Sequence, residues 1–424
     1  MKSSLLIKLV ILSLLFMENC TSPTPLSGSV RAAEDDSFLT GLLSGDPFLD
    51  FIARQKNELG VQVVYTRIDR QKNGKARFTD HYFNVNTGTY FYPASTVKFP
   101  VAVLALQKLN ELKITGLDKY STMITGVAGE KQTEVCNDPS AADGRPTIAH
   151  YIKKILLVSD NDAFNRLYEF LGQEYINNSL QQLGYTDVQI IHRLSTSLPD
   201  AENRFTNPVT FMDTSGRIIY QQPAQKSKLV YAERNTRMGT GYMQGGKRVD
   251  EPFDFSQKNR LSLPALHAIV RSIMFPGSVP ANQRFNLTKE DYDFLRRYMS
   301  MRPGESVSPV YSPKDYWDNY VKMIYYGAEK SAPDTTIRVF NKTGTAYGFL
   351  IDAAYVADFS NNIEFMVSAV IYCNSDGIFN DDQYDYEKIG YPFFKQLGRI
   401  LYAYELKRQK KQQPDLSSFH YLYR

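Results

Sequence analysis

Segments typical of β-strands lie near both ends of the chain, and the long middle part is mostly helical in pattern. Near the N-terminus, VQVVYTRID (61–69) alternates and is rich in β-branched residues, and HYFNV (81–85) is a weaker second strand. Three more strands are predicted near the C-terminus: TIRVFNKTG (336–344), GFLIDAAYVAD (348–358) and IEFMVSAVIYC (363–373). Terminal strands that pair into one antiparallel sheet would leave the middle to form a helical lobe. The seam between the two parts is then the expected place for chemistry.

The helical segments follow from the spacing of apolar residues. PFLDFIARQKNEL (47–59) ends at Gly60, a natural helix stop, and YPFFKQLGRILYAYELKRQKK (391–411) is amphipathic. The long, polar stretch 206–258 has little periodicity, and a loop of that length in a compact domain is usually functional or disordered. One further helix is predicted from the PASTVKFP stretch to Leu112. Two helices that meet at SDN are predicted within 147–172, and single helices over 261–275 and 288–300.

Composition excludes several classes of function. With 424 residues, 43% of them hydrophobic, the chain has ample material for a core. Its 49 lysines and arginines against 45 acids give a net charge of +4, too small to indicate a nucleic-acid partner. There is no Gly-rich phosphate loop and no Cys/His cluster at zinc spacing, so neither a cofactor nor a metal is expected.

The first residues indicate export. MKSSLLIKLVILSLLFMENC (1–20) has lysines around a short apolar run, which is the shape of a signal peptide. It ends at Cys20, before a Pro/Ser-rich linker (21–45), and so resembles the start of a bacterial lipoprotein with Cys20 acylated. Glu18 and Asn19 are not the small residues usual before such a cleavage site, and the alternative is an uncleaved anchor. We expect a periplasmic protein or a membrane-anchored lipoprotein of a bacterium.

Two cysteines, Cys136 and Cys373, follow Cys20. They lie far apart in the sequence, and nothing in the pattern pairs them. A disulfide is possible in an exported protein, but two free, buried thiols are the expectation.

The stretch PASTVKFP (93–100) contains a serine and a lysine three residues apart. Ser95 stands before an apolar helix, where a developing oxyanion would meet the positive end of the helix dipole. Lys98 shares its face and, if buried beside another cation, would lose its proton readily enough to act as a base. The alternative is a helix cap followed by a surface lysine, which Ser-x-x-Lys alone does not exclude.

Two further short motifs carry the same kind of ambiguity. In VSDN, Ser159 and Asn161 sit at a break between helices and can both point into a cleft, although a simple helix cap explains them as well. In VFNKTGTAYG, Lys342 lies within an apolar strand, where its alternative role is to protect a sheet edge from aggregation. The residues that follow it are Thr343, Gly344 and Thr345, and the glycine would let a second backbone approach closely.

The three motifs together, in this order, resemble the signature of the penicillin-recognising serine enzymes, and the spacing from Ser95 to Ser159 is similar to that of class A β-lactamases. SDNDAFN continues the resemblance through Asn165. It implies an α+β fold in which a five-stranded antiparallel sheet with flanking terminal helices lies beside an all-α lobe. The expected organisation is a catalytic domain over 46–411, with an α/β lobe (46–92 and 336–411), a helical lobe (93–335) containing an enlarged Ω-loop region (193–258), and a tail (412–424).

The resemblance also implies roles. Ser95 would be the nucleophile, Lys98 its base, and the hydroxyl of Ser159 a proton relay to the leaving nitrogen. Asn161 would hold the substrate amide, with Asn165 in support. Lys342, Thr343, Gly344 and Thr345 would form the strand that binds the substrate's carboxylate and backbone. The expected partner is a β-lactam or a cell-wall peptide, and we expect a monomer.

The chain departs from the family where the deacylating base belongs. Arg193 matches the arginine of the Ω-loop, but Ser195 stands where the glutamate is expected. Glu202 is the candidate replacement, with a surface acid as the alternative. The sequence therefore leaves three functions open. They are a serine β-lactamase, a penicillin-binding DD-peptidase-like hydrolase with slow deacylation, and a non-catalytic binding module on the same fold.

Overall fold

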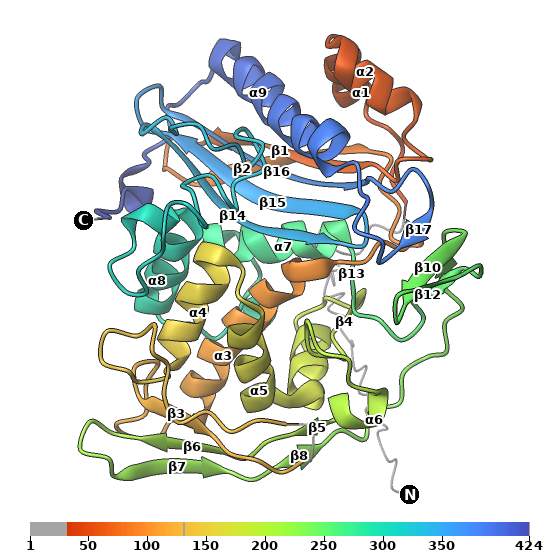
Figure 1. Ribbon diagram of the computed structural model, residues 1–424. Helices are drawn as coiled ribbons and strands as arrows, with labels where there is room; N and C mark the ends of the chain where they lie inside the picture. Colours follow the sequence, from red (N-terminus) through yellow and green to blue (C-terminus); the bar gives the residue numbers. More distant parts are fainter. Residues whose placement is uncertain (1–31, 130–131, 424) are drawn as a thin grey trace, which may run out of the picture.

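In the computed structural model, which describes residues 32–129 and 132–423, the terminal strands form one sheet (Figure 1). Its strand order is β14-β15-β16-β1-β2, and every neighbouring pair is antiparallel. The N-terminal hairpin joins the C-terminal strands where β1 pairs with β16, with Val64 opposite Ser368. The predicted antiparallel sheet is confirmed. Its strands are β1 (Gln62–Arg70), β2 (Ala76–Phe83), β14 (Ile337–Ala346), β15 (Phe349–Asp358) and β16 (Ile363–Tyr372).

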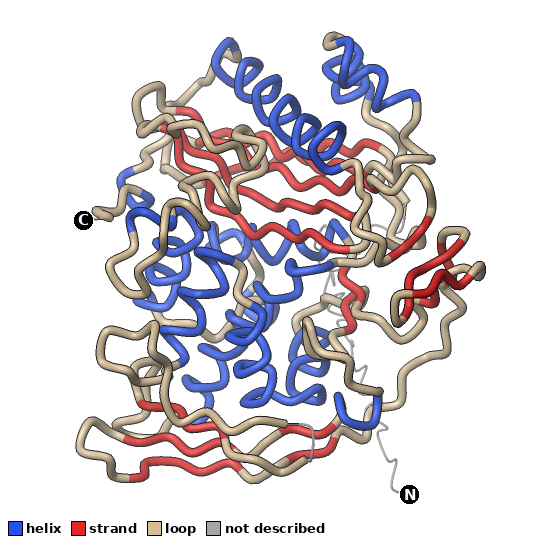
Figure 2. The backbone as a smooth tube through the Cα atoms, viewed as in Figure 1, coloured by secondary structure: helices blue, strands red, loops and turns tan. Residues whose placement is uncertain are grey.

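Helices cover both faces of this sheet (Figures 1 and 2). The outer face is covered by terminal helices, whose buried side chains, such as Leu39 and Leu397, share one core with the strands. The inner face packs against α7, which separates the sheet from the helical lobe. The helices concerned are α1 (Ser37–Ser44), α2 (Pro47–Arg54), α7 (Leu263–Met274) and α9 (Tyr391–Lys407).

The second lobe is built around α3 (Lys98–Leu112), whose residues from Lys98 to Leu109 are all buried. A helix buried on every side belongs at the centre of a lobe. Around it lie α4 (Ile148–Val158), α5 (Asn161–Gln182) and α8 (Lys289–Ser300). Since α3 begins beside β14, the start of the central helix lies at the seam between the two lobes.

The resemblance implied an all-α lobe, but the second lobe also contains strands. A three-stranded sheet of β3 (Thr122–Thr125), β6 (Val209–Met212) and β7 (Ile218–Gln222) lies at its end remote from the main sheet (Figure 2). Part of the aperiodic stretch 206–258 therefore forms short strands. The remaining short elements are β4 (Val188–Gln189), α6 (Asp200–Asn203), β5 (Phe205–Thr206), β8 (Gln225–Lys226), β9 (Arg237–Met238), β10 (Gly241–Gln244), β11 (Lys247–Val249), β12 (Phe253–Asp254), β13 (Arg260–Leu261) and β17 (Ile378–Phe379), with the single turns η2 (Ala94–Val97), η3 (Pro276–Ser278), η4 (Ala281–Gln283), η5 (Pro303–Glu305), η6 (Tyr386–Gly390) and η7 (Ser417–Phe419).

Some predicted boundaries were wrong. The expected linker 21–45 contains α1, which Asp36 caps by accepting a hydrogen bond from the N–H of Phe38. The expected tail 412–424 is packed rather than free, because Phe419 is buried against aromatic rings of the sheet. Cys373 is buried but Cys136 is exposed, so only one of the two free thiols is buried as expected.

The predicted signal peptide and Cys20 lie outside the described residues. Within 32–129 and 132–423, no helix combines the length and the apolar character needed to cross a membrane. In the same residues no group of three or more histidine, cysteine or acidic side chains is arranged to hold a metal ion.

Candidate active site

Ser95 lies in a tight turn at the seam between the lobes. The prediction set it at the start of an α-helix, but a single 3-10 turn, η2, comes first and α3 begins at Lys98. The turn is fixed by Thr96, whose backbone N–H and hydroxyl both donate to the carbonyl of Pro93. Ser95 is partly exposed, and its hydroxyl has no hydrogen-bond partner among the described residues. It is thus free to face a ligand.

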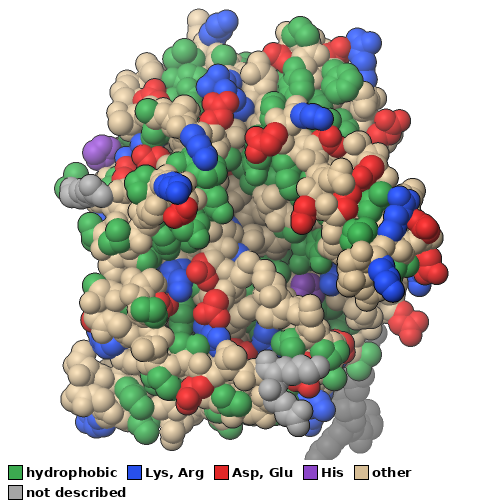
Figure 3. Space-filling model, viewed as in Figure 1, with side chains coloured by type: hydrophobic (Ala, Val, Ile, Leu, Met, Phe, Trp, Pro, Cys, Tyr) green, Lys and Arg blue, Asp and Glu red, His purple; other side chains and the backbone are tan. Residues whose placement is uncertain are grey.

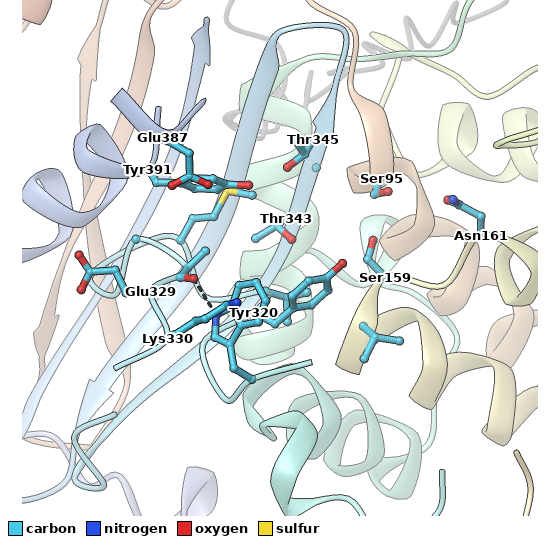
Figure 4. Close-up of a pocket in the computed structure, with 17 residues that line it drawn as sticks. Ser95, Ser159, Asn161, Tyr320, Glu329, Lys330, Thr343, Thr345, Glu387 and Tyr391 are labelled. Atoms are coloured by element: carbon cyan, nitrogen blue, oxygen red, sulfur yellow. Dashed lines mark hydrogen bonds between the residues drawn. The ribbon is translucent and has the colours of Figure 1, made fainter. Parts of the chain in front are cut away.

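Ser159 and Asn161 lie at the break between α4 and α5, as the VSDN motif predicted. Ser159 ends α4 in the left-handed conformation, with φ 60°. Asp160 starts the next helix, since its carboxylate accepts a hydrogen bond of 2.8 Å from the N–H of Ala163. The motif therefore forms a helix cap and also contributes residues to the cleft. Asp160 is the helix cap, while Ser159 and Asn161 face the cleft (Figure 4).

The ammonium group of Lys98 is buried beneath these two residues. It donates to the carbonyl of Ser159, and its Nζ lies 3.2 Å from Ser159 Oγ and 2.6 Å from Asn161 Oδ1. Burial lowers the pKa of Lys98 well below its ordinary value, and the positive charge of Lys342 lowers it further. Lys98 can therefore hold a free amine at a pH where a surface lysine is charged.

Lys342 reaches the same hydroxyl from strand β14. Its Nζ lies 2.9 Å from Ser159 Oγ and donates to the carbonyl of Thr343 at 2.7 Å. Burial lowers the pKa of Lys342 to about 7, an effect that the carboxyl of Asp352 opposes. Lys342 therefore does not protect an exposed sheet edge from aggregation, because its side chain is buried and directed into the seam.

Gly344 explains how β14 comes so close to the turn. A Cβ atom added to this residue would lie 2.8 Å from the carbonyl oxygen of Pro93 and 3.1 Å from the backbone nitrogen of Ser95. Any side chain would push the strand away from the nucleophile. The exposed Thr345 follows directly, at the strand edge beside Ser95.

These contacts join Lys98, Ser159 and Lys342 into one chain of polar groups beside Ser95. Two buried lysines that share one hydroxyl disfavour each other's charge, so the arrangement keeps one amine ready to accept a proton. The hydroxyl between them can pass a proton on. This arrangement is suited to activating a nucleophile and protonating a leaving group.

Two pockets meet at Ser95, on the face where the lobes join (Figure 3). The larger, of 640 Å³, is lined by Ser159, Thr343 and a segment before β14. The smaller, of 500 Å³, is lined by Leu194, Ser195 and several tyrosines. Ser95, Asn161 and Thr345 line both pockets. A bound molecule can thus extend to either side of the nucleophile.

The loop that begins at Arg193 is anchored firmly below the smaller pocket. The guanidinium of Arg193 donates to Glu169 at 2.6 Å, and both side chains are buried. Asn165 pairs with the backbone of Leu194 in both directions, at 2.9 and 3.0 Å. These bonds carry the next residue, Ser195, to the site, where its hydroxyl accepts a hydrogen bond of 2.7 Å from Asn161.

Glu202 is not brought to the site. It lies on α6, with its carboxylate close to Gly129, and the residues that line the two pockets do not include it. Asn165, its expected partner, is bound to Leu194 instead. The place of the expected glutamate is occupied by Ser195.

One wall of the larger pocket was not predicted. It comes from 316–330, an irregular segment that contains the only tryptophan of the chain. Trp317 Nε1 donates to the carbonyl of Ala328 at 2.7 Å, the bond drawn in Figure 4. Glu387 and Tyr391 line the same pocket, across from Ser95 and Ser159 (Figure 4). The aromatic run YWDNY was the available signal, but it has no period that indicates a pocket.

One comparison with known proteins, the match to a family model, agrees with the motifs. The model of the Beta-lactamase enzyme family matches residues 51–230, which include Ser95, Lys98 and Ser159. A search of curated proteins finds no relative of the chain.

Among solved structures, the chain is similar to a class A β-lactamase from Clostridium kluyveri DSM 555, with 15% identity, 87% of this chain and 98% of that chain covered, and a TM-score of 0.47. It is also similar to a β-lactamase from Desulfarculus baarsii DSM 2075, with 14% identity, 86% and 98% coverage, and a TM-score of 0.46. The family match covers less than half of the chain, and over that part it supports the resemblance of the motifs to β-lactamase-like serine hydrolases.

Proposed function

We propose that the protein forms an acyl-enzyme through Ser95 with β-lactams and with amides of cell-wall peptides. The Ser95 oxygen attacks the carbonyl carbon while Lys98, as the free amine, takes the hydroxyl proton. The C–N bond then breaks as Ser159 gives its proton to the leaving nitrogen and is reprotonated from the lysines. The observation that carries this proposal is the hydroxyl of Ser159 held between two buried lysines, 3.2 Å from Lys98 and 2.9 Å from Lys342.

The remaining residues of the site would bind the substrate and stabilise the developing oxyanion. The backbone N–H groups of Ser95 and Thr345 would form the oxyanion hole, worth about 3 kcal/mol for each donor. Asn161 would hold the amide of the acyl group. Lys342 and Thr343 would meet a carboxylate of the substrate through charge-assisted hydrogen bonds.

We propose further that release of the acyl group is slow, so that the protein acts as a penicillin-binding, peptidase-like enzyme. Hydrolysis of an acyl-enzyme needs a base beside the attacking water. Ser195, at the place where the family has its glutamate, cannot supply one, and Glu202 lies outside both pockets. The second candidate is a true β-lactamase, favoured by the family match itself. The intact set of polar groups around Ser95 speaks against a purely binding role.

Mass spectrometry after incubation with benzylpenicillin tests the proposal. We expect a covalent adduct on the native protein, none on Ser95→Ala, and an adduct lifetime of minutes or more. Absence of any adduct on the native protein would refute acyl-enzyme chemistry. An adduct that disappears within seconds, with hydrolysed penicillin accumulating, would favour the β-lactamase alternative.

The cellular location stays a proposal, as does the monomeric state. Export through residues 1–20, with lipid on Cys20, would bring the site to cell-wall substrates outside the cytoplasmic membrane. Fractionation of cells that make the native chain and Cys20→Ser tests this. The native protein should stay with the membranes and the variant should be released.

A further inference from the structure

We propose that the larger pocket is a leaving-group subsite that takes a peptide of at least two residues with a cationic side chain at its far end. The inference rests on the proposed function and concerns the half of the substrate that departs when the acyl-enzyme forms. It would make the natural substrate an amide bond inside a longer peptide, not one that releases a single terminal amino acid.

The direction of the substrate follows from the proton donor. The leaving nitrogen must lie near the hydroxyl that protonates it, which is that of Ser159. Ser159 and Thr343 line the 640 Å³ pocket and not the 500 Å³ pocket. The leaving group therefore occupies the larger pocket. The acyl half lies on the other side of Ser95, among the tyrosines near Ser195.

The size of the pocket exceeds what one amino acid needs. Pockets of about 300–1,000 Å³ enclose whole drug-sized ligands. At 640 Å³, this pocket continues past Thr343 to the segment 316–330 and to the start of α9 (Figure 4). A single residue bound at Thr343 and Thr345 would leave the far part of the pocket empty.

The far wall is held rigidly in place. Trp317 binds the carbonyl of Ala328, and Asn319 donates to the carbonyls of Glu329 and Ser331 at 3.2 and 2.9 Å. Lys322 of the same segment is buried and donates to the carbonyl of Met299 at 2.6 Å. A wall fixed before binding loses little conformational entropy when a ligand arrives, which favours a specific subsite over an open surface.

One acid at the rim of the pocket, Glu387, is placed to meet a cation. Glu329 is already paired with Lys395, and Lys330 lies over the Trp317 ring, 4.7 Å from its centroid. Glu387 is exposed at the pocket and, within the described residues, has no hydrogen bond or ion pair. It lies beside Tyr391 (Figure 4). An ammonium group on the leaving peptide would pair with this carboxylate.

Three synthetic substrates with the same acyl half and the same scissile amide test the inference. Their leaving groups are alanine, alanyl-norleucine and alanyl-lysine, and the second-order rate of amine release is measured for each. We expect alanyl-lysine to react at least tenfold faster than alanine. In Glu387→Gln the preference for lysine over norleucine should fall by at least threefold, whereas the control Glu58→Gln, an exposed acid outside the pockets, should keep it.

The same preparations are treated with benzylpenicillin, so that the two proposals are separated. A penicillin adduct together with equal rates for alanine and alanyl-lysine would overturn the inference alone. A lysine preference that survives in Glu387→Gln would overturn the assignment of the cation site. Absence of the penicillin adduct would refute the proposed function on which the inference rests.

Discussion

The side-chain amide of Asn161 donates a hydrogen bond of 2.7 Å to the hydroxyl of Ser195, in the pocket that Ser95 also lines. A residue on the helical lobe and a residue of the loop thus meet where an acyl-enzyme would need its hydrolytic water. Neither group is a base at neutral pH, because an amide does not titrate and a serine hydroxyl gives up its proton only when a base activates it. The contact therefore supports the proposal that release of the acyl group is slow.

Replacement of Ser195 by glutamate should therefore shorten the lifetime of the penicillin adduct. The loop already directs this position toward Asn161, so the new carboxylate would lie near the acyl carbonyl. A general base contributes typically 10²–10⁴-fold, and a fraction of that, about tenfold, is expected from a base that has not been optimised. The decay of the adduct, followed by intact-protein mass spectrometry, measures the effect.

Ser195→Gln is the matched control for that experiment, since it has the size of glutamate but no basic group. It should leave the adduct at least as long-lived as in the native protein. If the glutamine variant also speeds up release, the change comes from a disturbed loop and not from a base.

Glu202→Gln tests the alternative base directly. Because Glu202 lies on α6, outside both pockets, the substitution should change neither the formation nor the decay of the adduct. A lifetime that increases several-fold would contradict this expectation. It would mean that Glu202 reaches the site during turnover.

The pH dependence of acylation should report the charge of Lys342. Lys98 acts only as the free amine, so the acylation rate rises as the pH passes upward through the pKa of Lys98. Burial lowers that pKa first and the charge of Lys342 lowers it further. Lys342→Ala removes the second effect, so the pKa of Lys98 rises and the rising limb of the profile moves to higher pH.

The position of that limb, rather than its height, is the quantity to compare, because Lys342 also has a proposed role in binding. Lys342→Arg keeps a permanent charge, and its limb should lie at or below the native position. If the acylation rate rises over the same pH range in Lys342→Ala and in the native protein, the two lysines do not influence each other's titration.

The sequence predicted those secondary-structure elements that are determined by residues close together in the chain. Alternating, β-branched residues predicted the five strands, and the SDN break predicted the end of α4 and the start of α5. The motifs also predicted that Ser159 and Lys342, 183 residues apart, would share one site, and the structure brings them within 2.9 Å.

The parts that escaped prediction depend on contacts between distant segments. Strand β10 pairs with β17, so that Tyr242 lies opposite Phe379, and neither strand has enough residues to show a period. The wall 316–330 is irregular, and Lys322 ties it to the carbonyls of Met299 and Val339, which lie outside the segment. No local propensity indicates such bonds, because each depends on where the rest of the chain has folded.

The stability of the site should depend on Lys322, which lies buried behind β14. Its Nζ donates to the carbonyls of Met299 and Val339, at 2.6 and 3.0 Å, and to Asn341 Oδ1 at 2.9 Å. Asn341 in turn donates to the buried carboxyl of Asp352 at 2.8 Å. Lys322→Met would take the lysine donor away from three buried acceptors and would leave Asp352 with Lys342 as its remaining nearby cation. We expect a loss of about 3 kcal/mol or more in the free energy of unfolding.

Urea unfolding followed by circular dichroism measures that loss. Lys314→Met, at an exposed lysine of the same stretch, is the control and should change the free energy of unfolding by no more than about 0.5 kcal/mol. Because Lys322 also fixes the wall of the larger pocket, its replacement should weaken the preference for long leaving groups even at temperatures where the variant is fully folded. Equal stability of Lys322→Met and the native protein would mean that water or a rearranged side chain satisfies the three acceptors, and that the wall does not depend on this lysine.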